Sequence, residues 1–330
     1  MTIGEVYRLA IEVAKKADPR PASEIRHVLK EAKEEYKKLS AKKKQFFDKE
    51  RLINPYADTR ILYGSLKNKV KKVMVGVDIE DGELMLAQQL SQNRNTKIDL
   101  VIGHHPEGIA LRHLGKVMDI QEQVMYVAGV PINVTEKVLA PRIAEVDRSL
   151  HARNNERLVD FARLLNVPFG CFHTVADNMV HDFLQKFLDR KKLRTVREVM
   201  DSLLEITEFQ VAEKQGSGPA VFTGSEKSKA GKVLVSGMTG GTEGSEKIYE
   251  RLAHAGVGTL IDMHISEKNR KEAEKHHLNV IVAGHIASDS IGLNLLLDEI
   301  INACRQDKKK EIEIVPCSGF IRVDRCKKKK

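Results

Sequence analysis

The sequence predicts an α/β protein made of two duplicated, three-layer α/β lobes with mostly parallel sheets, preceded by an N-terminal helical segment. From about residue 66, short apolar runs alternate with amphipathic stretches, as strands and helices do in parallel α/β folds. The order strand, helix, strand, histidine occurs twice, because Lys72–Val75 and Leu100–His104 match Lys232–Val235 and Leu260–His264, 160 residues later. Residues 1–50, by contrast, are dense in Lys, Glu and Ala.

The composition is typical of a globular protein with a large core. The chain has 330 residues, of which 42% are hydrophobic and 31% charged, so about two domains are expected and wholesale disorder is excluded. No apolar run reaches the roughly 18 residues of a membrane span, and the charged N-terminus is unlike a signal peptide. The four cysteines form no CxxC pair, which argues against a disulfide scaffold. We therefore expect a reduced, cytoplasmic protein with no membrane partner.

The net charge of +9 suggests a polyanionic partner such as nucleic acid. Residues 1–50, however, hold 13 Lys and Arg against 9 Asp and Glu, and the tail Lys327–Lys330 adds four lysines. These two ends account for eight of the nine excess charges, which leaves about +1 for residues 51–326. Nucleic-acid binding therefore remains an alternative for the two ends and not for the body.

Residues 1–66 are predicted to form the N-terminal helical segment. Within Glu24–Lys49, apolar residues lie near helical spacing at Ile25, Val28, Leu29, Ala32 and Tyr36. We favour a solvated helical hairpin that packs on the body or on a neighbouring subunit. The alternative is a polyanion-binding arm, but no aromatic residues interleave with its charges, although Phe46 and Phe47 lie near its end.

The first α/β lobe, with inserted helices, is expected over residues 67–230. Apolar runs predict its strands, and stretches with a partly apolar face predict its helices. The expected strands are Lys72–Asp78, Ile98–Ile102, Val130–Val134, Val167–Phe172, Phe209–Val211 and Ala220–Phe222, and the expected helices are Asp81–Asn93, Arg142–Leu165 and helices between Asp182 and Glu205.

The second α/β lobe, residues 231–330, repeats this alternation and ends in the basic tail. The alternation of strands with helices predicts mostly parallel strands. The expected strands are Lys232–Val235, Val257–Ile261, Leu278–Val282 and Glu311–Val315, and the expected helices are Ser245–Ala255, Glu267–His276 and Asp289–Ala303.

Paired histidines follow one of the predicted strands. Ligands of open α/β sheets bind beyond the carboxyl ends of the strands. The strand that ends at Gly103 runs into His104 and His105, and then into Pro106, which stiffens the turn. Two ordinary loop histidines are the alternative, but paired imidazoles at a strand end have few purely structural uses.

Two further segments repeat this pattern. One strand delivers His173, with Asp177 four residues on, and another delivers His285, with Asp289 in the first turn of the next helix. An i, i+4 spacing on a helix brings both side chains onto one face, although helix capping is the alternative for the carboxylates. Together the three segments supply histidine and aspartate side chains. This set of candidate ligands suits Zn, Mn, Fe, Ni or Co and is too rich in imidazole for a dedicated Ca²⁺ or Mg²⁺ site.

With these residues in view, the chain resembles the NIF-three-like family (NGG-one-interacting factor), also called the GTP cyclohydrolase I type 2 family of dinuclear-metal proteins. The resemblance runs from about Asn54 to Ile321 and rests on IDLVIGHHPEG, HTVAD, MHISEK and VIVAGHIASD. It implies a pair of α/β lobes, two divalent transition metal ions bound close together and, as in bacterial members, a homohexameric ring. The implied metal ligands are His104, His105, Asp177, His285 and Asp289.

The sequence departs from the family pattern in three places. The last ligand is usually Glu, whereas Asp289 is one methylene shorter. Ala176 replaces a leucine that is common in the second motif, and the stretch between His105 and His173 is long enough for an extra helix. Because of these departures, the distance between the metals and the segment that covers the site can differ from the family pattern.

A dinuclear centre of this kind predicts a hydrolase. Two metals about 3.5–4 Å apart can activate a shared water as hydroxide and polarise a carbonyl, amidine or phosphoryl oxygen. The expected substrate is a nucleotide, a phosphoester or a cyclic amide. His173 and Glu267 are the candidates for proton transfer or substrate positioning, and a hydrogen bond that orients a ligand is the alternative role for both. His264, the repeat equivalent of His104, is expected near the site with no assigned role.

The glycine-rich segment Gly237–Ser245 follows a strand and opens a predicted helix. Backbone N–H groups at such a turn can hold a phosphate, but the segment matches neither the Walker A nor the GxGxxG spacing. A flexible turn with an N-cap at Ser245 is the alternative. A phosphate here would favour a phosphorylated or nucleotide-like small-molecule partner.

The alternative function is a metal-containing binding or regulatory protein without turnover, as the family's name of interacting factor suggests.

Overall fold

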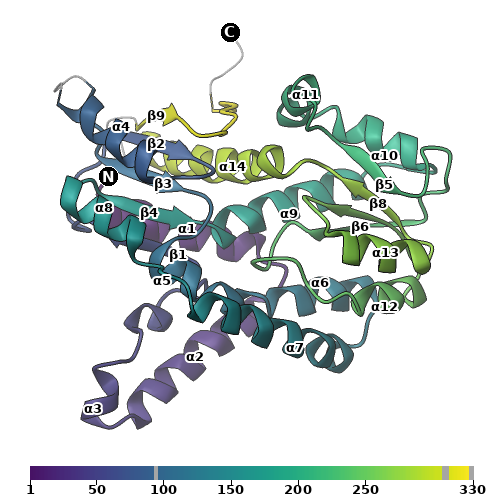
Figure 1. Cartoon of the computed structure of the whole chain (residues 1–330), viewed down its shortest axis with the longest axis horizontal. Coiled ribbons are helices and arrows are strands. Elements are labelled where there is room, and N and C mark those ends of the chain that lie inside the picture. The colour runs from purple at the N-terminus through teal and green to yellow at the C-terminus, as the bar shows by residue number, and fades with distance from the viewer. Residues whose placement is uncertain (93–95, 307–311, 327–330) are drawn as a thin grey trace.

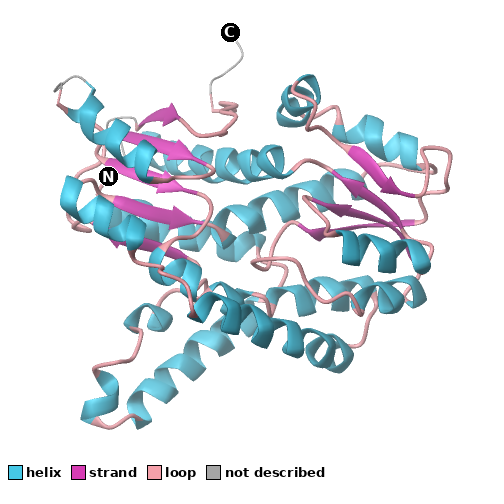
Figure 2. Cartoon of the chain, in the orientation of Figure 1, coloured by secondary structure: helices cyan, strands magenta, loops and turns pink. Residues whose placement is uncertain are grey.

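Two β-sheets form the framework of the computed structural model, which describes residues 1–92, 96–306 and 312–326. The first sheet has the strand order β1-β4-β3-β2-β9, and the second has the order β5-β8-β7-β6. The parallel strands of the two sheets point toward each other, so that their carboxyl ends meet in the middle of the molecule (Figure 2). The strands are β1 (Thr59–Tyr63), β2 (Lys72–Gly76), β3 (Leu100–Gly103), β4 (Phe169–Phe172), β5 (Ala220–Thr223), β6 (Lys232–Gly237), β7 (Val257–Asp262), β8 (Asn279–Val282) and β9 (Glu313–Pro316).

The second sheet repeats the topology of the first. In each sheet, one edge strand, β1 or β5, runs antiparallel to its neighbour, and the remaining strands are parallel. The repeated sequence segments lie in β2 and β6 and at the ends of β3 and β7. The predicted α/β class, with duplicated lobes and mostly parallel sheets, is confirmed. The first sheet has one additional strand, β9, which pairs with β2.

Helices cover both faces of each sheet (Figure 1). In the first sheet, Val73 and Val75 face a cluster with α1, α9 and α14, whereas Met74 faces α4 and α8. Burial on both faces is what a parallel sheet requires, and it explains the continuous apolar runs of the strands. The helices are α1 (Ile3–Ala17), α2 (Ala22–Lys38), α3 (Ala41–Lys44), η1 (Lys49–Leu52), α4 (Asp81–Ser91), α5 (Gly108–Arg112), η3 (Leu114–Val117), α6 (Ile120–Ala128), α7 (Ile132–His151), α8 (Arg157–Leu165), α9 (Thr174–Asp189), α10 (Val196–Leu203), α11 (Thr207–Lys214), α12 (Ile248–His254), α13 (Glu267–Lys275) and α14 (His285–Gln306).

Helices α9 and α14 lie side by side between the two sheets (Figure 1). Their crossing is close because Gly292 of α14 lies directly against Ala176 of α9, where a Cβ atom on Gly292 would overlap the Ala176 carbonyl oxygen. The small Ala176 side chain lies at this same contact. Asp177 and Asp289 are next to the crossing, so it sets how close their carboxylates come.

The N-terminal helical segment is confirmed, and its parts differ in burial. Helix α1 is packed into the body through an apolar face that includes Ile3 and Ala10. Helices α2 and α3 project away from the body (Figure 1), and α2 buries only Ile25 and Ala32. Phe46, at the end of this arm, is 82% exposed.

Two predictions within the first lobe are wrong. Val130–Val134 is not a strand, because α7 begins at Ile132 directly after Pro131. A proline is well tolerated where a helix starts, and Val134 and Val138, one turn apart, pack on the same apolar cluster. The predicted single helix Arg142–Leu165 is two helices, α7 and α8, because the chain turns over residues 152–156, where two adjacent asparagines disfavour the helix.

A third prediction is also wrong, because Phe209–Val211 lies within α11 and not in a strand. Phe209 and Ala212 are both buried, and their spacing of three residues places them on one helical face. The strand β1 was not predicted, and it lies within the segment 1–66 that was expected to be helical.

The division of the chain at residues 66 and 230 stays a prediction. The two sheets do not follow the boundary at residue 230. Strand β5 lies before this boundary but belongs to the second sheet, and β9 lies after it but belongs to the first sheet. Asn93 and Glu311, at the ends of predicted elements, and the tail Lys327–Lys330 lie outside the described residues. In the part of the chain that the structure describes, no helix is both long and apolar enough to cross a membrane.

Candidate metal centre

The paired histidines are held at the carboxyl end of β3. The backbone N–H of His104 donates to the carbonyl oxygens of Gly76 and Val77, and that of His105 donates to Val77 as well. Gly103 is in close contact with Ile79, since a Cβ atom there would lie 3.2 Å from Ile79 Cγ1. The loop therefore continues the β2–β3 ladder for two residues and fixes both imidazoles at the sheet edge.

The Nδ1 atom of each of these rings faces an acceptor. His104 Nδ1 lies 3.3 Å from the Phe172 carbonyl oxygen, and His105 Nδ1 lies 2.6 Å from Asp78 Oδ1. A ring that donates from Nδ1 keeps its lone pair on Nε2. A carboxylate or carbonyl behind the imidazole is the arrangement that orients histidine ligands of metals.

His173 and Asp177 come from the junction of β4 and α9. His173 is the N-cap of α9, and Asp177 lies in its first turn. His173 Nδ1 is 2.7 Å from Asp58 Oδ2 and 3.6 Å from Asp177 Oδ2. Thr174 also donates to Asp58, at 2.6 Å, so the buried Asp58 fastens the start of α9.

His285 and Asp289 come from the junction of β8 and α14. Helix α14 begins at His285, and His285 Nε2 lies 3.6 Å from Asp289 Oδ2. Gly284 makes this start possible, because its φ of +104° favours glycine and a Cβ atom there would lie 2.6 Å from the Ser217 carbonyl oxygen. The predicted i, i+4 pairing on one helix face is present.

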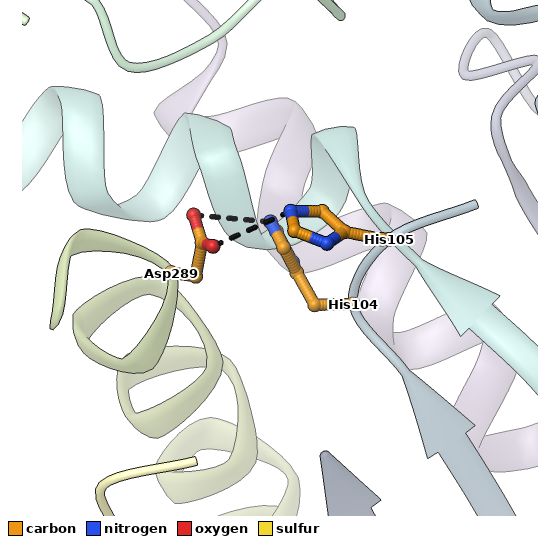
Figure 3. Close-up of side chains that lie close together, drawn as sticks. All are labelled: His104, His105 and Asp289. Atoms are coloured by element: carbon orange, nitrogen blue, oxygen red, sulfur yellow. Dashed lines mark ion pairs between the residues drawn. The ribbon is translucent and has the colours of Figure 1, made fainter. Parts of the chain in front are cut away.

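The side chains from the three junctions converge on one point. His104 Nε2 lies 3.2 Å from Asp177 Oδ1 and 3.3 Å from Asp289 Oδ1. His105 Nε2 lies 3.5 Å from Asp289 Oδ2 and 3.4 Å from His285 Nε2. Figure 3 shows His104 and His105 reaching the Asp289 carboxylate from the end of β3. The structure thus brings together all five residues that were predicted as metal ligands.

Buried carboxylate oxygens in this cluster lack hydrogen-bond donors. Both Asp289 oxygens and Asp177 Oδ1 are buried and accept no hydrogen bond of good geometry from the described residues. A buried oxygen without a donor costs about 1–3 kcal/mol, and more when it is charged. Two overlapping groups, His104 with His105 and Asp289, and His104 with His173 and Asp177, place their ligand atoms within 4.8 Å of one another. This mixture of imidazole and carboxylate fits a transition metal.

The same groups shift one another's pKa values. Burial alone would lower the pKa of the His104 imidazole, but the Asp289 and Asp177 carboxylates outweigh it and raise that pKa well above its usual value. Burial would raise the pKa of Asp289, but the neighbouring His104 imidazole lowers it to about 2. Burial lowers the pKa of His105 and of His285. Near neutral pH, Asp289 is therefore anionic, and His105 and His285 have free lone pairs.

Among solved structures, a NIF3 superfamily protein from Sphaerobacter thermophilus is similar to this chain. It shares 27% sequence identity, the match covers 80% of this chain and 91% of the other, and the TM-score is 0.67. The chain has a NIF3-like fold.

Two further NIF3-like matches are more distant. Reduced HcgD from Methanocaldococcus jannaschii is 14% identical over 84% of this chain and 97% of its own, with a TM-score of 0.44. A Bacillus cereus protein related to NIF3 is 13% identical over 80% of this chain and 92% of its own, with a TM-score of 0.44. No family model and no curated protein matches the sequence.

In this NIF3-like chain, a cavity of about 360 Å³ opens onto the cluster. His105, His173, Asp177 and His285 line one part of it, and its other walls come from α5–α6 and from the second lobe. The glycine-rich segment 237–245 lines the cavity as well. Its helix, α12, begins only at Ile248, and the side-chain amide of Gln121 donates to two carbonyl oxygens of the segment, at 2.7 Å each. The segment is therefore fastened to α6.

The two other residues singled out near the site have different surroundings. His264 lines the cavity and stacks on His285, with ring centroids 4.9 Å apart and an interplanar angle of 9°. Glu267 is not among the residues that line the cavity. Its carboxylate is 62% exposed and pairs with Arg270 on the surface of α13. The structure thus brings His173, but not Glu267, to the cluster.

Sequence reasoning missed the two carboxylates behind the histidines. Asp78 lies two residues after the end of β2 and was included in the predicted strand Lys72–Asp78, although its position at a strand end is the signal that identified His104. Asp58 precedes a strand that was not predicted, and no local pattern connects it with His173, 115 residues away.

The second lobe adds a buried carboxyl group, Asp262, whose titration can be measured. Burial raises its pKa from 3.8 to about 6, despite the hydrogen bond from Ser236. The folded state therefore holds this proton more tightly than the unfolded chain does, and raising the pH from about 4 to about 6 costs the folded state on the order of 3 kcal/mol. Above pH 6, the variant Asp262→Asn is expected to be more stable than the wild type by an amount that disappears toward pH 4. Urea unfolding at pH 4, 5, 6 and 7 measures this difference, and parallel profiles would contradict it.

Proposed function

We propose that the chain is a dinuclear-metal-dependent hydrolase of a nucleotide, phosphoester or cyclic amide. The observation that carries the proposal is the convergence of buried, donor-free oxygens of Asp177 and Asp289 on His104 Nε2. Without a bound metal ion, the nearest positive charge for these oxygens is the His104 imidazole, whose pKa they raise.

The ligands in this proposal are His104, His105, Asp177, His285 and Asp289. Two divalent ions of Zn, Fe, Mn, Ni or Co would supply Lewis acidity, which acidifies a water and polarises the bond to be cleaved. Asp289 would help to hold these ions, because its Oδ1 faces His104 and its Oδ2 faces both His105 and His285.

His173 is the candidate for holding a proton in the reaction. Burial would lower its pKa, but the carboxylates of Asp177 and Asp58 outweigh this and raise it. A protonated imidazole at the cavity wall can donate to a leaving group, and Asp58 keeps the ring in place. Since Glu267 lies on the surface of α13, we do not include it in the mechanism.

The cavity favours a small, partly apolar and anionic substrate. Its walls include Leu111, Leu114 and Met238, and the exposed Arg153 also lines it. An arginine beside an apolar cavity is suited to a phosphate or carboxylate group on the ligand.

The test is a metal analysis combined with a hydrolysis screen. Protein reconstituted with each of the five metals should hold about two equivalents and hydrolyse at least one nucleotide, phosphoester or cyclic amide. His173→Gln should lower kcat by about 100-fold or more while the metal content stays at the wild-type level, as removal of a general acid does. Less than one tightly bound equivalent after reconstitution would overturn the proposal.

A second candidate function is a metal-containing binding or regulatory protein without turnover. The projecting arm of α2 and α3 favours it, because Phe46 at its end is 82% exposed and suited to contact another protein. Two bound metals without turnover on any of these substrate classes would favour this function. Assembly as a homohexamer is a related proposal from the family resemblance, which light scattering of the purified protein tests.

A further inference from the structure

Asp262 lies in the wall of the cavity, at the carboxyl end of β7, and the metal-centre proposal does not use it. Its side chain is only 6% exposed. Oδ1 accepts a hydrogen bond from the Ser236 hydroxyl of the neighbouring strand, and the backbone N–H of Gly237 donates to the same carboxyl group. The position of the carboxyl group is therefore fixed from one side.

The other oxygen of this carboxyl group has no donor. Within the described ranges 1–92, 96–306 and 312–326, no hydrogen bond to Asp262 Oδ2 is found, although Asp262 lines the cavity. An acceptor oxygen that faces a cavity can bind an N–H or O–H group of a ligand in place of water. Its charged neighbours are His264 and Glu243, and neither forms an ion pair with it in the structure described.

The surroundings of Asp262 indicate the shape of that ligand. His264 and His285 form a nearly parallel stack, with an interplanar angle of 9°, which gives the cavity a flat aromatic surface. Met238 and Leu252 add apolar walls. A flat, partly apolar ring fits such a space better than a flexible polar chain does, because it loses less conformational entropy and buries apolar area.

We propose that Asp262 is a specificity-determining residue that accepts a hydrogen bond from a ring N–H group of a planar heterocyclic substrate. The substrate class is then a cyclic amide or a heterocyclic base with a free ring N–H, and not a simple phosphoester. That the ligand is a substrate rests on the proposed function. That Asp262 binds a ring N–H group does not. Asp262 makes the contact to the ring, and His285, which stacks on His264, connects this part of the cavity with the other proposed metal ligands.

The test uses small probes that differ only in their N–H groups. Uracil and hydantoin each have ring N–H groups, and 1,3-dimethyluracil and 1,3-dimethylhydantoin have none. Saturation-transfer NMR on the purified full chain should show binding of the first pair at least tenfold tighter than that of the second. Asp262→Asn replaces an acceptor with an amide that can present a donor, and it should remove this preference.

Two control variants and a metal analysis separate the outcomes. Glu299→Gln makes the same chemical change on the exposed face of α14 and should leave the preference intact. Ser236→Ala removes the donor to Oδ1 but leaves Oδ2 in place, so it should weaken the preference less than Asp262→Asn does. An unchanged preference in Asp262→Asn, equal binding of the methylated probes, or no binding of uracil and hydantoin to the wild type would each overturn the inference. An N–H preference in a protein without bound metal or turnover would instead contradict the hydrolase proposal alone.

Discussion

Replacing Asp289 with asparagine is expected to reduce the bound transition metal from about two equivalents to one or none, with an affinity loss of more than 100-fold. The reason is the position of this carboxylate, whose two oxygens face different imidazoles: Oδ1 lies 3.3 Å from His104 Nε2, and Oδ2 lies 3.5 Å from His105 Nε2. Asparagine keeps the shape of the side chain but removes the negative charge and one of the two acceptor oxygens. Metal analysis after dialysis and competition with a chelator measure the loss.

The control for this variant is Asp182→Asn, which makes the same change on the more exposed part of α9, where Asp182 pairs with Lys186. It should retain the metal content of the wild type. Circular dichroism of the metal-free proteins should show that Asp289→Asn remains folded. Two equivalents of metal in a folded Asp289→Asn protein, held as tightly as in the wild type, would contradict the assignment.

The stability of Asp289→Asn is expected to depend on pH as well. The change in stability relative to the wild type has the opposite sign to that expected for Asp262→Asn. The pKa of Asp289 is lowered from 3.8 to about 2 in the folded, metal-free protein. The stabilisation from its charged form is therefore complete above pH 4 and is lost as the pH falls toward 2. Asp289→Asn should accordingly be less stable than the wild type near neutral pH, with a difference that shrinks in acid. The two buried carboxyl groups of the cavity thus titrate in opposite directions.

The clustering of the candidate site residues could be predicted from the sequence because strand ends leave a local signal. A buried apolar run that ends in Gly103 and continues as His104 and His105 is rarely needed for packing alone, and the i, i+4 spacing of His285 and Asp289 needs only a helix start to bring both onto one face. What surrounds the ligands could not be predicted in this way. Asp58 holds His173 from the residue before β1, a strand whose short sequence gives no distinct pattern, and the contact between them depends on the packing of the whole lobe.

Nearness to His264 in the sequence did not predict which carboxylate lies at the cavity. Glu267 lies in the MHISEK motif close to His264, but it is the first residue of α13, where a glutamate is stabilised by the helix dipole and by Arg270. Asp262, two residues before His264, is the side chain that lines the cavity. The alternation of side chains along β7 and the turn after it decide which residue faces inward, and the sequence motif carries no such information.

The crossing of α9 and α14 leads to the second large effect, which is structural. In an exposed helix, Gly→Ala usually stabilises by about 1 kcal/mol. At Gly292 the same change should instead destabilise the protein by about 1–3 kcal/mol, because the new methyl group overlaps the Ala176 carbonyl oxygen and both helices are fully buried there. To relieve this overlap, the helices must separate, and Asp177 and Asp289 separate with them.

Gly292→Ala is therefore expected to lose metal affinity as well as stability, although Gly292 is not itself a ligand. The matched control is Gly82→Ala in α4, where a Cβ atom has nothing within 4 Å. This control should be neutral or slightly stabilising and should bind metal like the wild type. Thermal unfolding of the metal-free proteins measures the first effect, and chelator competition measures the second. If Gly292→Ala were as stable as the control and kept its metal, the close crossing of the helices would not be what holds the two carboxylates together.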